Sequence, residues 1–158
     1  MFLYEYKMER GIAMDSRVES YFEDIKGKKI AFLGIGGSNL PLAKIFRQKG
    51  AIVFACDKRE KEQLGKTGEE LEQMGITLKL GEHYLEQLDV DMMFRTPGMR
   101  FHTKELEQAR EKGIVVTSEM EVFFDLCPCP IYAVTGSDGK TTTTTIISEF
   151  LKAAGKRI

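Results

Sequence analysis

Short apolar runs alternate with amphipathic segments along most of this chain. The apolar runs predict buried strands, since glycine, proline or charged residues bound each of them. In chain order they read "KKIAFL", "AIVFACD", "ITLKL", "VDMMFR", "IVVTS" and "IYAVTG". Near-continuous apolar strands separated by helices are typical of a parallel sheet that helices cover on both faces. The pattern therefore predicts an α/β fold built on a parallel sheet.

The amphipathic segments predict the helices of that fold. A first helix starts at an N-cap, which is Asp15 or Ser16. Later helices are predicted in "SNLPLAKIFRQKG", "TKELEQAREKG" and "EMEVFFDLC", while "REKEQLGKTGEELEQMG" is either helix or loop. In the second helix the spacing places the apolar residues Leu42, Ile45 and Phe46 on one helical face, and the helix ends at Gly50.

Changes in pattern divide the chain into three parts. Residues 1–27 are predicted to be an N-terminal extension and a leading helix, and we expect Met14 to be an alternative or true start. Residues 28–128 are the predicted α/β domain. The motif "CPCP" is a hinge candidate, because proline pushes the residue before it out of the helical region. Residues 129–158 then supply the first strand, loop and helix of a second domain.

Composition narrows the class of protein. The 158 residues carry a formal net charge of −1, and 42% of them are hydrophobic, which is enough for a packed core. Acids and bases are interspersed, so no basic face for nucleic acid is expected. No apolar run approaches the roughly 20 residues of a membrane span, and no signal-like apolar segment follows Met1. We therefore expect a soluble cytoplasmic protein without nucleic-acid or membrane partners.

The three cysteines do not suggest a disulfide framework, since Cys56 is far in sequence from Cys127 and Cys129. The two histidines, His83 and His102, are also far in sequence from the C-x-C pair, which argues against a zinc site at these thiols. We expect reduced cysteines.

A first glycine-rich turn, "GIGGSN", follows the first strand of the predicted domain. Such a turn lets the backbone approach an anion held on the N-terminus of the next helix. Asp57 ends the next strand, 23 residues after Gly34, where a dinucleotide fold places its ribose-binding acid. The G-x-G-x-x-G pattern is nevertheless incomplete, because Asn39 stands at the last glycine position. Three interpretations stay open: a nucleotide site, a dinucleotide site, or a tight turn without a ligand.

A second glycine-rich turn, "TGSDGKTT", follows the last predicted strand. Its N–H groups are placed to converge on phosphate oxygens. Lys140 would supply a charge to the β- and γ-phosphates, and the Thr141 hydroxyl a ligand for Mg²⁺. The pattern is the short G-x-x-G-K-T-T, since Val134 stands where a longer phosphate loop has its first glycine. The alternative is a plain glycine turn with a chance lysine.

Taken in series, "GIGGSN", "FRTPG", "TSEMEVFF" and "GSDGKTTT" resemble the Mur ligases of peptidoglycan synthesis, and within them the branch that adds D-glutamate. The resemblance covers nearly the whole chain from residue 28. Two departures are Asp138, where asparagine is commoner, and Gly37-Ser38-Asn39, where x-[ST]-G is more usual. The second departure affects the details of uridine contact.

The resemblance implies a three-domain enzyme, of which this chain would be the Rossmann-like first domain, which binds the UDP-sugar, and the start of the second, which binds ATP. It implies ATP-dependent amide formation through an acyl phosphate, which joins D-glutamate to UDP-N-acetylmuramoyl-L-alanine. ATP would be contacted by Gly136, Ser137, Asp138, Gly139, Lys140, Thr141 and Thr142, with Lys140 and Thr141 catalytic and Thr141 a partial Mg²⁺ site. The UDP-sugar would be contacted by Gly34, Ile35, Gly36, Gly37, Ser38, Asn39, Asp57, Lys58, Arg59, Thr96, Pro97 and Gly98.

Some alternatives remain at this point. "GIGGSN" with Asp57 also suits an NAD(P)-dependent dehydrogenase, and the whole chain suits a non-catalytic nucleotide-sugar-binding module. Ser118, Glu119 and Glu121 are either paired catalytic acids or the N-terminal cap of a helix. The segment from Ile131 onward carries apolar residues that we expect to be held by contact with another copy of the chain.

Overall fold

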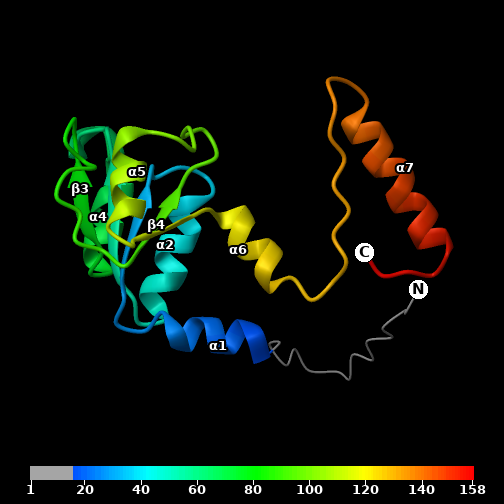
Figure 1. The fold of residues 1–158 in the computed structure, drawn as a ribbon, viewed down its shortest axis with the longest axis horizontal. Helices are drawn as coiled ribbons and strands as arrows, with labels where there is room; N and C mark the ends of the chain where they lie inside the picture. Colours follow the sequence, from blue (N-terminus) through cyan, green and yellow to red (C-terminus); the bar gives the residue numbers. More distant parts are fainter. Residues whose placement is uncertain (1–15) are drawn as a thin grey trace. The chain divides into compact units, whose positions relative to one another are not determined.

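The structure, a computed structural model, describes residues 16–158, which form two units that divide between Leu126 and Cys127 (Figure 1). The first unit contains the sheet, and the second contains one long helix. The predictions made for residues 1–13 and for a start at Met14 lie outside the described residues.

The first unit is built on a five-stranded sheet in which every pairing is parallel. Its strands are β1 (Lys29–Leu33), β2 (Ile52–Asp57), β3 (Thr77–Leu80), β4 (Met92–Arg95) and β5 (Val115–Thr117). They lie in the order β3-β2-β1-β4-β5, so the chain moves outward from β1 in one direction and then returns to its other side. This is the strand order of a Rossmann-like fold, and its switch point lies between β1 and β4.

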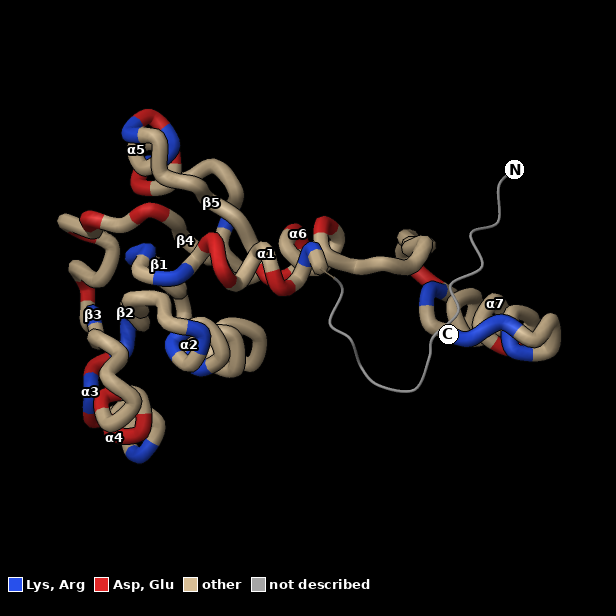
Figure 2. The backbone as a smooth tube through the Cα atoms, turned by 90° about the horizontal axis from the view of Figure 1, so that it is seen from below, with Lys and Arg blue, Asp and Glu red and all other residues tan. Residues whose placement is uncertain are grey.

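Helices cover both faces of the sheet, as the alternating pattern predicts. The first unit contains α1 (Ser16–Asp24), α2 (Asn39–Gln48), α3 (Lys61–Leu64), α4 (Lys66–Gln73), α5 (Lys104–Glu111) and α6 (Glu119–Leu126). Figure 2 shows α2, α3 and α4 on one side of the strands and α5 on the other. Side chains of β1 alternate accordingly: Ile30 and Phe32 join the core under α2, while Ala31 and Leu33 join the core under α5.

Three phenylalanine rings fix α2 over the switch point. Phe32 of β1 and Phe94 of β4 stack with their centroids 4.8 Å apart. Phe46 of α2 meets both rings edge-on, at 5.3 and 5.1 Å. Aromatic pairs of this kind contribute about 0.5–1.5 kcal/mol each beyond the burial of their area. The cluster therefore holds the axis of α2, and with it the N-terminus of the helix, against the ends of β1 and β4.

The buried face of α2 is not the face that the apolar residues mark. The buried residues of this helix are Asn39, Ala43 and Phe46, which are spaced four and three residues apart along one face. Leu42 is only partly buried against the core, and Ile45 lies outside this face and is 40% exposed. A polar residue holds the first position of the stripe, and an apolar pattern alone does not reveal that.

The second unit contains α7 (Lys140–Ala153), the helix predicted after the second glycine turn. The strand predicted for "IYAVTG" is wrong, because residues 131–135 have no regular structure. A strand needs a partner for its backbone donors and acceptors, and no described strand pairs with this segment. Tyr132 and Phe150 are exposed, and the expected contact with another copy stays a prediction. Within residues 16–158, no helix is long and apolar enough to cross a membrane.

Candidate functional site

Two turns meet at the carboxyl edge of the sheet, where β1 and β4 end. Gly34 opens the first turn, and Thr96 opens the second. A Cβ built on Gly34 would lie 3.2 Å from Cγ2 of Thr96, and the φ of Gly34 is +88°. Both facts require glycine, since a side chain would meet the Thr96 methyl and strain the backbone. The structure thus brings together the "GIGGSN" and "TPG" turns, which the sequence separates by about 60 residues.

The first turn presents free hydrogen-bond donors to solvent. Within the described chain, the N–H groups of Gly36, Gly37 and Ser38 make no hydrogen bond. They precede α2, whose N-cap Ser38 makes no side-chain capping bond. Unpaired N–H groups and the positive end of the helix dipole together favour an anion. This turn has the donors that a phosphate or diphosphate requires.

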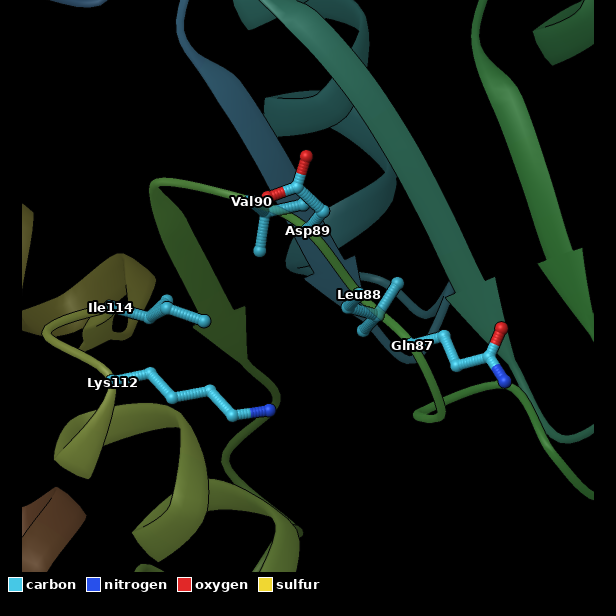
Figure 3. Close-up of a pocket in the computed structure, with 6 residues that line it drawn as sticks. All are labelled: Gln87, Leu88, Asp89, Val90, Lys112 and Ile114. Atoms are coloured by element: carbon cyan, nitrogen blue, oxygen red, sulfur yellow. The ribbon is translucent and has the colours of Figure 1, made fainter.

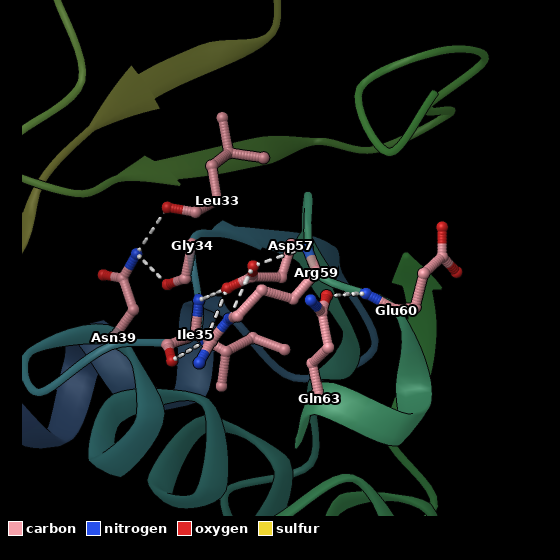
Figure 4. A network of polar contacts seen from close by, with 8 residues as sticks. All are labelled: Leu33, Gly34, Ile35, Asn39, Asp57, Arg59, Glu60 and Gln63. Atoms are coloured by element: carbon pink, nitrogen blue, oxygen red, sulfur yellow. Dashed lines mark hydrogen bonds and ion pairs between the residues drawn. The ribbon is translucent and has the colours of Figure 1, made fainter. Parts of the chain in front are cut away.

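Asp57, at the end of β2, holds the first turn in place by hydrogen bonds (Figure 4). Its Oδ2 accepts hydrogen bonds from the Ile35 N–H at 2.7 Å and from Nη2 of Arg59 at 2.8 Å. Its Oδ1 accepts from the N–H and the Nε of Arg59, each at 3.0 Å. Nη2 of Arg59 also donates to the Ile35 carbonyl at 2.7 Å. Asp57 and Arg59 therefore hold Ile35 by both of its backbone polar groups.

These contacts leave the Asp57 carboxylate little capacity for a ligand. Asp57 is only 6% exposed, and each of its oxygens already accepts two hydrogen bonds. Burial by itself would raise the pKa of Asp57, but hydrogen bonds from Arg59 and Ile35 outweigh it and lower the pKa to about 2. The neighbouring Lys58 is exposed and its side chain makes no hydrogen bond or ion pair with the other described residues. Of the residues 57–59, Lys58 is therefore the freest to meet a ligand.

The side chain of Asn39 is buried under the first turn and does not reach solvent. The residue is 1% exposed. Its Nδ2 donates to the carbonyls of Leu33, Gly34 and Phe94 at 3.0, 3.2 and 3.3 Å (Figure 4 draws the first two). Sequence reasoning expected a ligand contact at Asn39, and the structure shows a bond between the ends of two strands.

Ser118 and Glu121 form the start of α6. Oγ of Ser118 accepts from the Glu121 N–H at 3.4 Å, which is the geometry of a helix cap. The Glu121 carboxylate accepts from Oγ1 of Thr117 at 3.3 Å and lies 3.5 Å from Nη2 of Arg95. Burial would raise the pKa of Glu121, but Ser118, Arg95 and Thr117 lower it. This arrangement favours the capping interpretation over a pair of catalytic acids.

Arg95 is a residue at this edge that sequence reasoning missed. It ends β4 directly before the Thr96 turn, and its guanidinium lies 5.3 Å from the ring centroid of Phe101. Its Nε is buried without a partner. No motif marks an arginine at the end of an apolar strand, so only the parallel sheet reveals that Arg95 meets Glu121 of α6.

The second glycine turn has the features of a phosphate loop in its own unit. Gly139 precedes α7 in the left-handed conformation, with a φ of 73°. Nζ of Lys140 donates to the carbonyls of Gly136 and Ser137 at 2.6 and 2.9 Å, so the ammonium lies in the curve of the loop. Thr141 is exposed in the first turn of α7. A lysine ammonium in a glycine turn before a helix fits the triphosphate of ATP, and the Thr141 hydroxyl fits a Mg²⁺ ligand.

A hollow of about 420 Å³ lies at the opposite, amino edge of the sheet (Figure 3). It is lined by the segment before β4 and the turn before β5, through Gln87, Leu88, Asp89, Val90, Lys112 and Ile114. Ligands of open parallel sheets bind at the carboxyl edge. The hollow is therefore separate from the two turns.

Cys56 of β2 is completely buried next to Asp57. Burial raises the pKa of this thiol to about 12, with a smaller contribution from the Asp57 charge. Cys127 and Cys129 are also free thiols, and Cys129 is exposed. Cys56 is thus a packing residue of the core.

Comparison with known proteins decides the family. Residues 28–118 match the model of the Mur ligase MurD-like N-terminal domain. The chain belongs to the Mur ligase family. The match contains both turns of the carboxyl edge and the whole five-stranded sheet.

Curated Mur ligases extend the likeness into the second unit. The chain is 48% identical over 145 residues to UDP-N-acetylmuramoylalanine–D-glutamate ligase of Clostridium botulinum, which covers 91% of this chain and 32% of that protein. It is 50% identical over 143 residues to the enzyme of the same name from Acetivibrio thermocellus, with 90% and 31% covered. The chain thus spans about a third of the length of these relatives.

Solved Mur ligases share the fold. UDP-N-acetylmuramate-alanine ligase MurC from Thermotoga maritima is 30% identical with a TM-score of 0.51, over 79% of this chain and 29% of that chain. The murein peptide ligase mpl from Psychrobacter arcticus is 28% identical with a TM-score of 0.52, over 82% and 27%. Both support the Rossmann-like assignment of the first unit.

Proposed function

We propose that residues 28–118 bind the uridine diphosphate part of a UDP-linked sugar at the carboxyl edge of the sheet. The observation that carries the proposal is the set of three free N–H groups at Gly36, Gly37 and Ser38, which faces solvent at the switch point. The Thr96–Gly98 turn forms the other side of this site. The exposed Lys58 adds a positive charge at the neighbouring strand end.

The complete reaction that we propose is the ATP-dependent addition of D-glutamate to UDP-N-acetylmuramoyl-L-alanine. The support is the 48–50% identity to proteins named for that ligase activity. The substrate carboxylate attacks the γ-phosphorus and ADP leaves, after which the D-glutamate amine attacks the acyl carbon and inorganic phosphate leaves. The reaction implies action in the cytoplasm, where ATP is available.

For the second unit we propose a contribution to the ATP site. Lys140 would neutralise charge on the transferred phosphoryl group, and Thr141 would bind Mg²⁺. The N–H groups of Ser137 to Gly139 make no hydrogen bond in the described chain, which supports a phosphate-binding role for residues 136–142. Phosphoryl transfer depends mainly on positioning and charge stabilisation, and this loop supplies groups for both.

A nicotinamide-dependent dehydrogenase is the weaker alternative. That function would need Asp57 to accept hydrogen bonds from a ribose, but Ile35 and Arg59 already occupy both of its oxygens. It would also leave the second glycine turn without a role. A non-catalytic nucleotide-sugar-binding module would share the proposed site and would differ only in lacking ligase activity.

Nuclear magnetic resonance of the ¹⁵N-labelled chain tests the binding proposal. Adding UDP-N-acetylglucosamine, a stable UDP-sugar, is expected to shift amide signals of residues 34–39, 57–59 and 96–98. ADP and NADH serve as controls for general nucleotide and dinucleotide binding. Shifts confined to other surfaces, or equal shifts with NADH at residues 34–39, would contradict the proposed site.

A phosphate-release assay separates ligase from binding module. The 158-residue chain is expected to release no phosphate from ATP in the presence of UDP-N-acetylmuramoyl-L-alanine and D-glutamate. The reason is that these residues span only about a third of the length of the curated ligases. Release above a protein-free control would show that this view of the chain is wrong. The gene's complete product should be active in the same assay, and an inactive product would favour the binding module.

A further inference from the structure

The buried side chain of Asn39 links β1 and β4 by hydrogen bonds at the switch point. It is the first residue of α2, it follows β1 by six residues, and its amide reaches the Phe94 carbonyl of β4. The same amide also donates to the Leu33 and Gly34 carbonyls, at the end of β1. The side chain thus joins the two strand ends from which both turns of the candidate site emerge.

Packing alone does not explain an asparagine at this position. Its Oδ1 is buried without a hydrogen-bond partner, which is unfavourable for the folded state. An apolar side chain of similar size would fill the same space without that orphan acceptor, but it would leave three carbonyls without the amide donor. The distinctive contribution of Asn39 is therefore the link between β1 and β4.

The link made by Asn39 holds together two strand ends whose turns are in close contact. Gly34 lies so close to Thr96 that even a Cβ would approach the Thr96 methyl to 3.2 Å. The free N–H groups of Gly36 to Ser38 begin two residues after Gly34, so their direction depends in part on how the Gly34 backbone is held. A small separation of the strand ends would change the spacing between these donors and the Thr96–Gly98 turn.

We propose that Asn39 is a positioning residue, which holds the two turns at the spacing that a UDP-sugar diphosphate requires without contacting the ligand. The inference rests on the proposed UDP-sugar site. It differs from the expectation that Asn39 contacts the ligand, and it gives the departure from the G-x-G-x-x-G pattern a physical reason. Glycine at this position would remove the amide that joins the strands.

Binding measurements on Asn39→Ala and Asn39→Asp test the proposal. Both variants lose the amide donor, and a protonated aspartic acid regains a single O–H donor. We expect Asn39→Ala to bind UDP-N-acetylglucosamine about tenfold more weakly at every pH, which corresponds to about 1.4 kcal/mol. Asn39→Asp should bind more weakly still at pH 7.5 and recover part of its affinity at pH 5. The wild-type affinity should change less than about twofold over that range.

A matched control separates positioning from general destabilisation. Leu71→Ala removes a fully buried side chain from α4, away from both turns, and should lower the melting temperature. Its affinity for UDP-N-acetylglucosamine, measured well below its melting transition, should equal that of the wild type. An Asn39→Ala protein that is folded and binds with unchanged affinity would overturn the proposal.

A ligand-free measurement keeps the inference apart from the proposed function. The close approach of Gly34 to Thr96 should give a nuclear Overhauser effect between the Gly34 α-protons and the Thr96 methyl group. We expect this signal in the wild type and its weakening in Asn39→Ala, or in Asn39→Ser if the alanine variant does not fold. Persistence of the full signal would overturn the role of Asn39. A wild type that shows the signal and does not bind UDP-N-acetylglucosamine would instead contradict the proposed function.

Discussion

The guanidinium of Arg59 binds the carboxylate of Asp57 at two points, with Nε 3.0 Å from Oδ1 and Nη2 2.8 Å from Oδ2. The pair is formed within a single turn after β2, but it acts on Ile35, which follows β1. Because Asp57 is buried and Arg59 is partly exposed, the pair connects the core of the sheet to the surface of the candidate site. Its consequences for stability can be measured.

The Asp57 carboxylate should make stability depend on pH in the acid range. Its pKa falls from the usual 3.8 to about 2 in the folded protein. A lowered folded-state pKa stabilises the protein above the unfolded value, and this contribution is lost as the pH falls through about 2. Between pH 5 and pH 2 the wild type should lose about 2 kcal/mol of unfolding free energy more than Asp57→Asn does. Urea denaturation at both pH values measures the difference, and equal losses would contradict the assignment.

Two glycine substitutions should separate folding from binding in the first turn. Gly34→Ala should destabilise the protein by at least about 1–2 kcal/mol, because its φ is +88° and its Cβ would meet Thr96. Gly36→Ala should leave stability nearly unchanged, since a Cβ there meets no atom within 4 Å. The open space at Gly36 is where we expect the diphosphate, so this variant should still lose affinity for UDP-N-acetylglucosamine.

Thermal denaturation and titration calorimetry provide the two measurements for this glycine pair. A Gly36→Ala protein with wild-type affinity would mean that the ligand does not approach this part of the backbone. A Gly34→Ala protein with wild-type stability would mean that the two turns are further apart than described.

Ser118→Ala should weaken the start of α6. The substitution removes the Oγ that accepts a hydrogen bond from the Glu121 N–H. Loss of this cap should lower the unfolding free energy by about 1 kcal/mol. Ser20→Ala, at an exposed position of α1, is the matched control and should change stability very little. If Ser118 served only as part of a catalytic pair, its removal would leave the unfolding free energy as it is in the control.

Lys140→Ala should have no measurable effect on the 158-residue chain. The Lys140 side chain is exposed and contacts only its own loop, so the unfolding free energy should stay within about 0.5 kcal/mol of the wild type. Residues 131–135, which lead into the loop, have no strand partner to hold them, so Mg²⁺-ATP should bind weakly to both proteins. Titration calorimetry with Mg²⁺-ATP checks this. Tight binding that the substitution abolishes would show that the loop is already competent.

Local patterns were enough to predict most of the fold. The runs ending at Leu33, Asp57 and Arg95 form strands, and the amphipathic segments between the strands form helices. The reason is that a buried strand needs a continuous apolar run, whereas a helix on the sheet needs apolar residues on one face only. The strand predicted at residues 131–135 failed for a non-local reason, since its formation depends on a neighbouring strand. Sequence patterns carry little information about which neighbours a strand has.

The candidate site was predictable in its glycine turns and not in its supporting contacts. "GIGGSN" and "TPG" can be recognised as turns by their glycine and proline residues, and the parallel sheet brings them together. The bond from Asp57 to the Ile35 N–H spans 22 residues, and that from Asn39 to the Phe94 carbonyl spans 55. Both contacts depend on the order of the strands, which the sequence pattern does not give, so neither contact was predicted.

The complete burial of Cys56 makes the chain convenient for site-selective labelling. A thiol reacts with maleimides as the thiolate, and both burial and the raised pKa of Cys56 keep the thiolate concentration there negligible. Cys127 and Cys129, at the start of the second unit, are the thiols that reagents reach in the folded protein. A fluorophore attached there, on the unmodified sequence, would report on the connection between the sheet domain and the phosphate-loop segment as nucleotides are added.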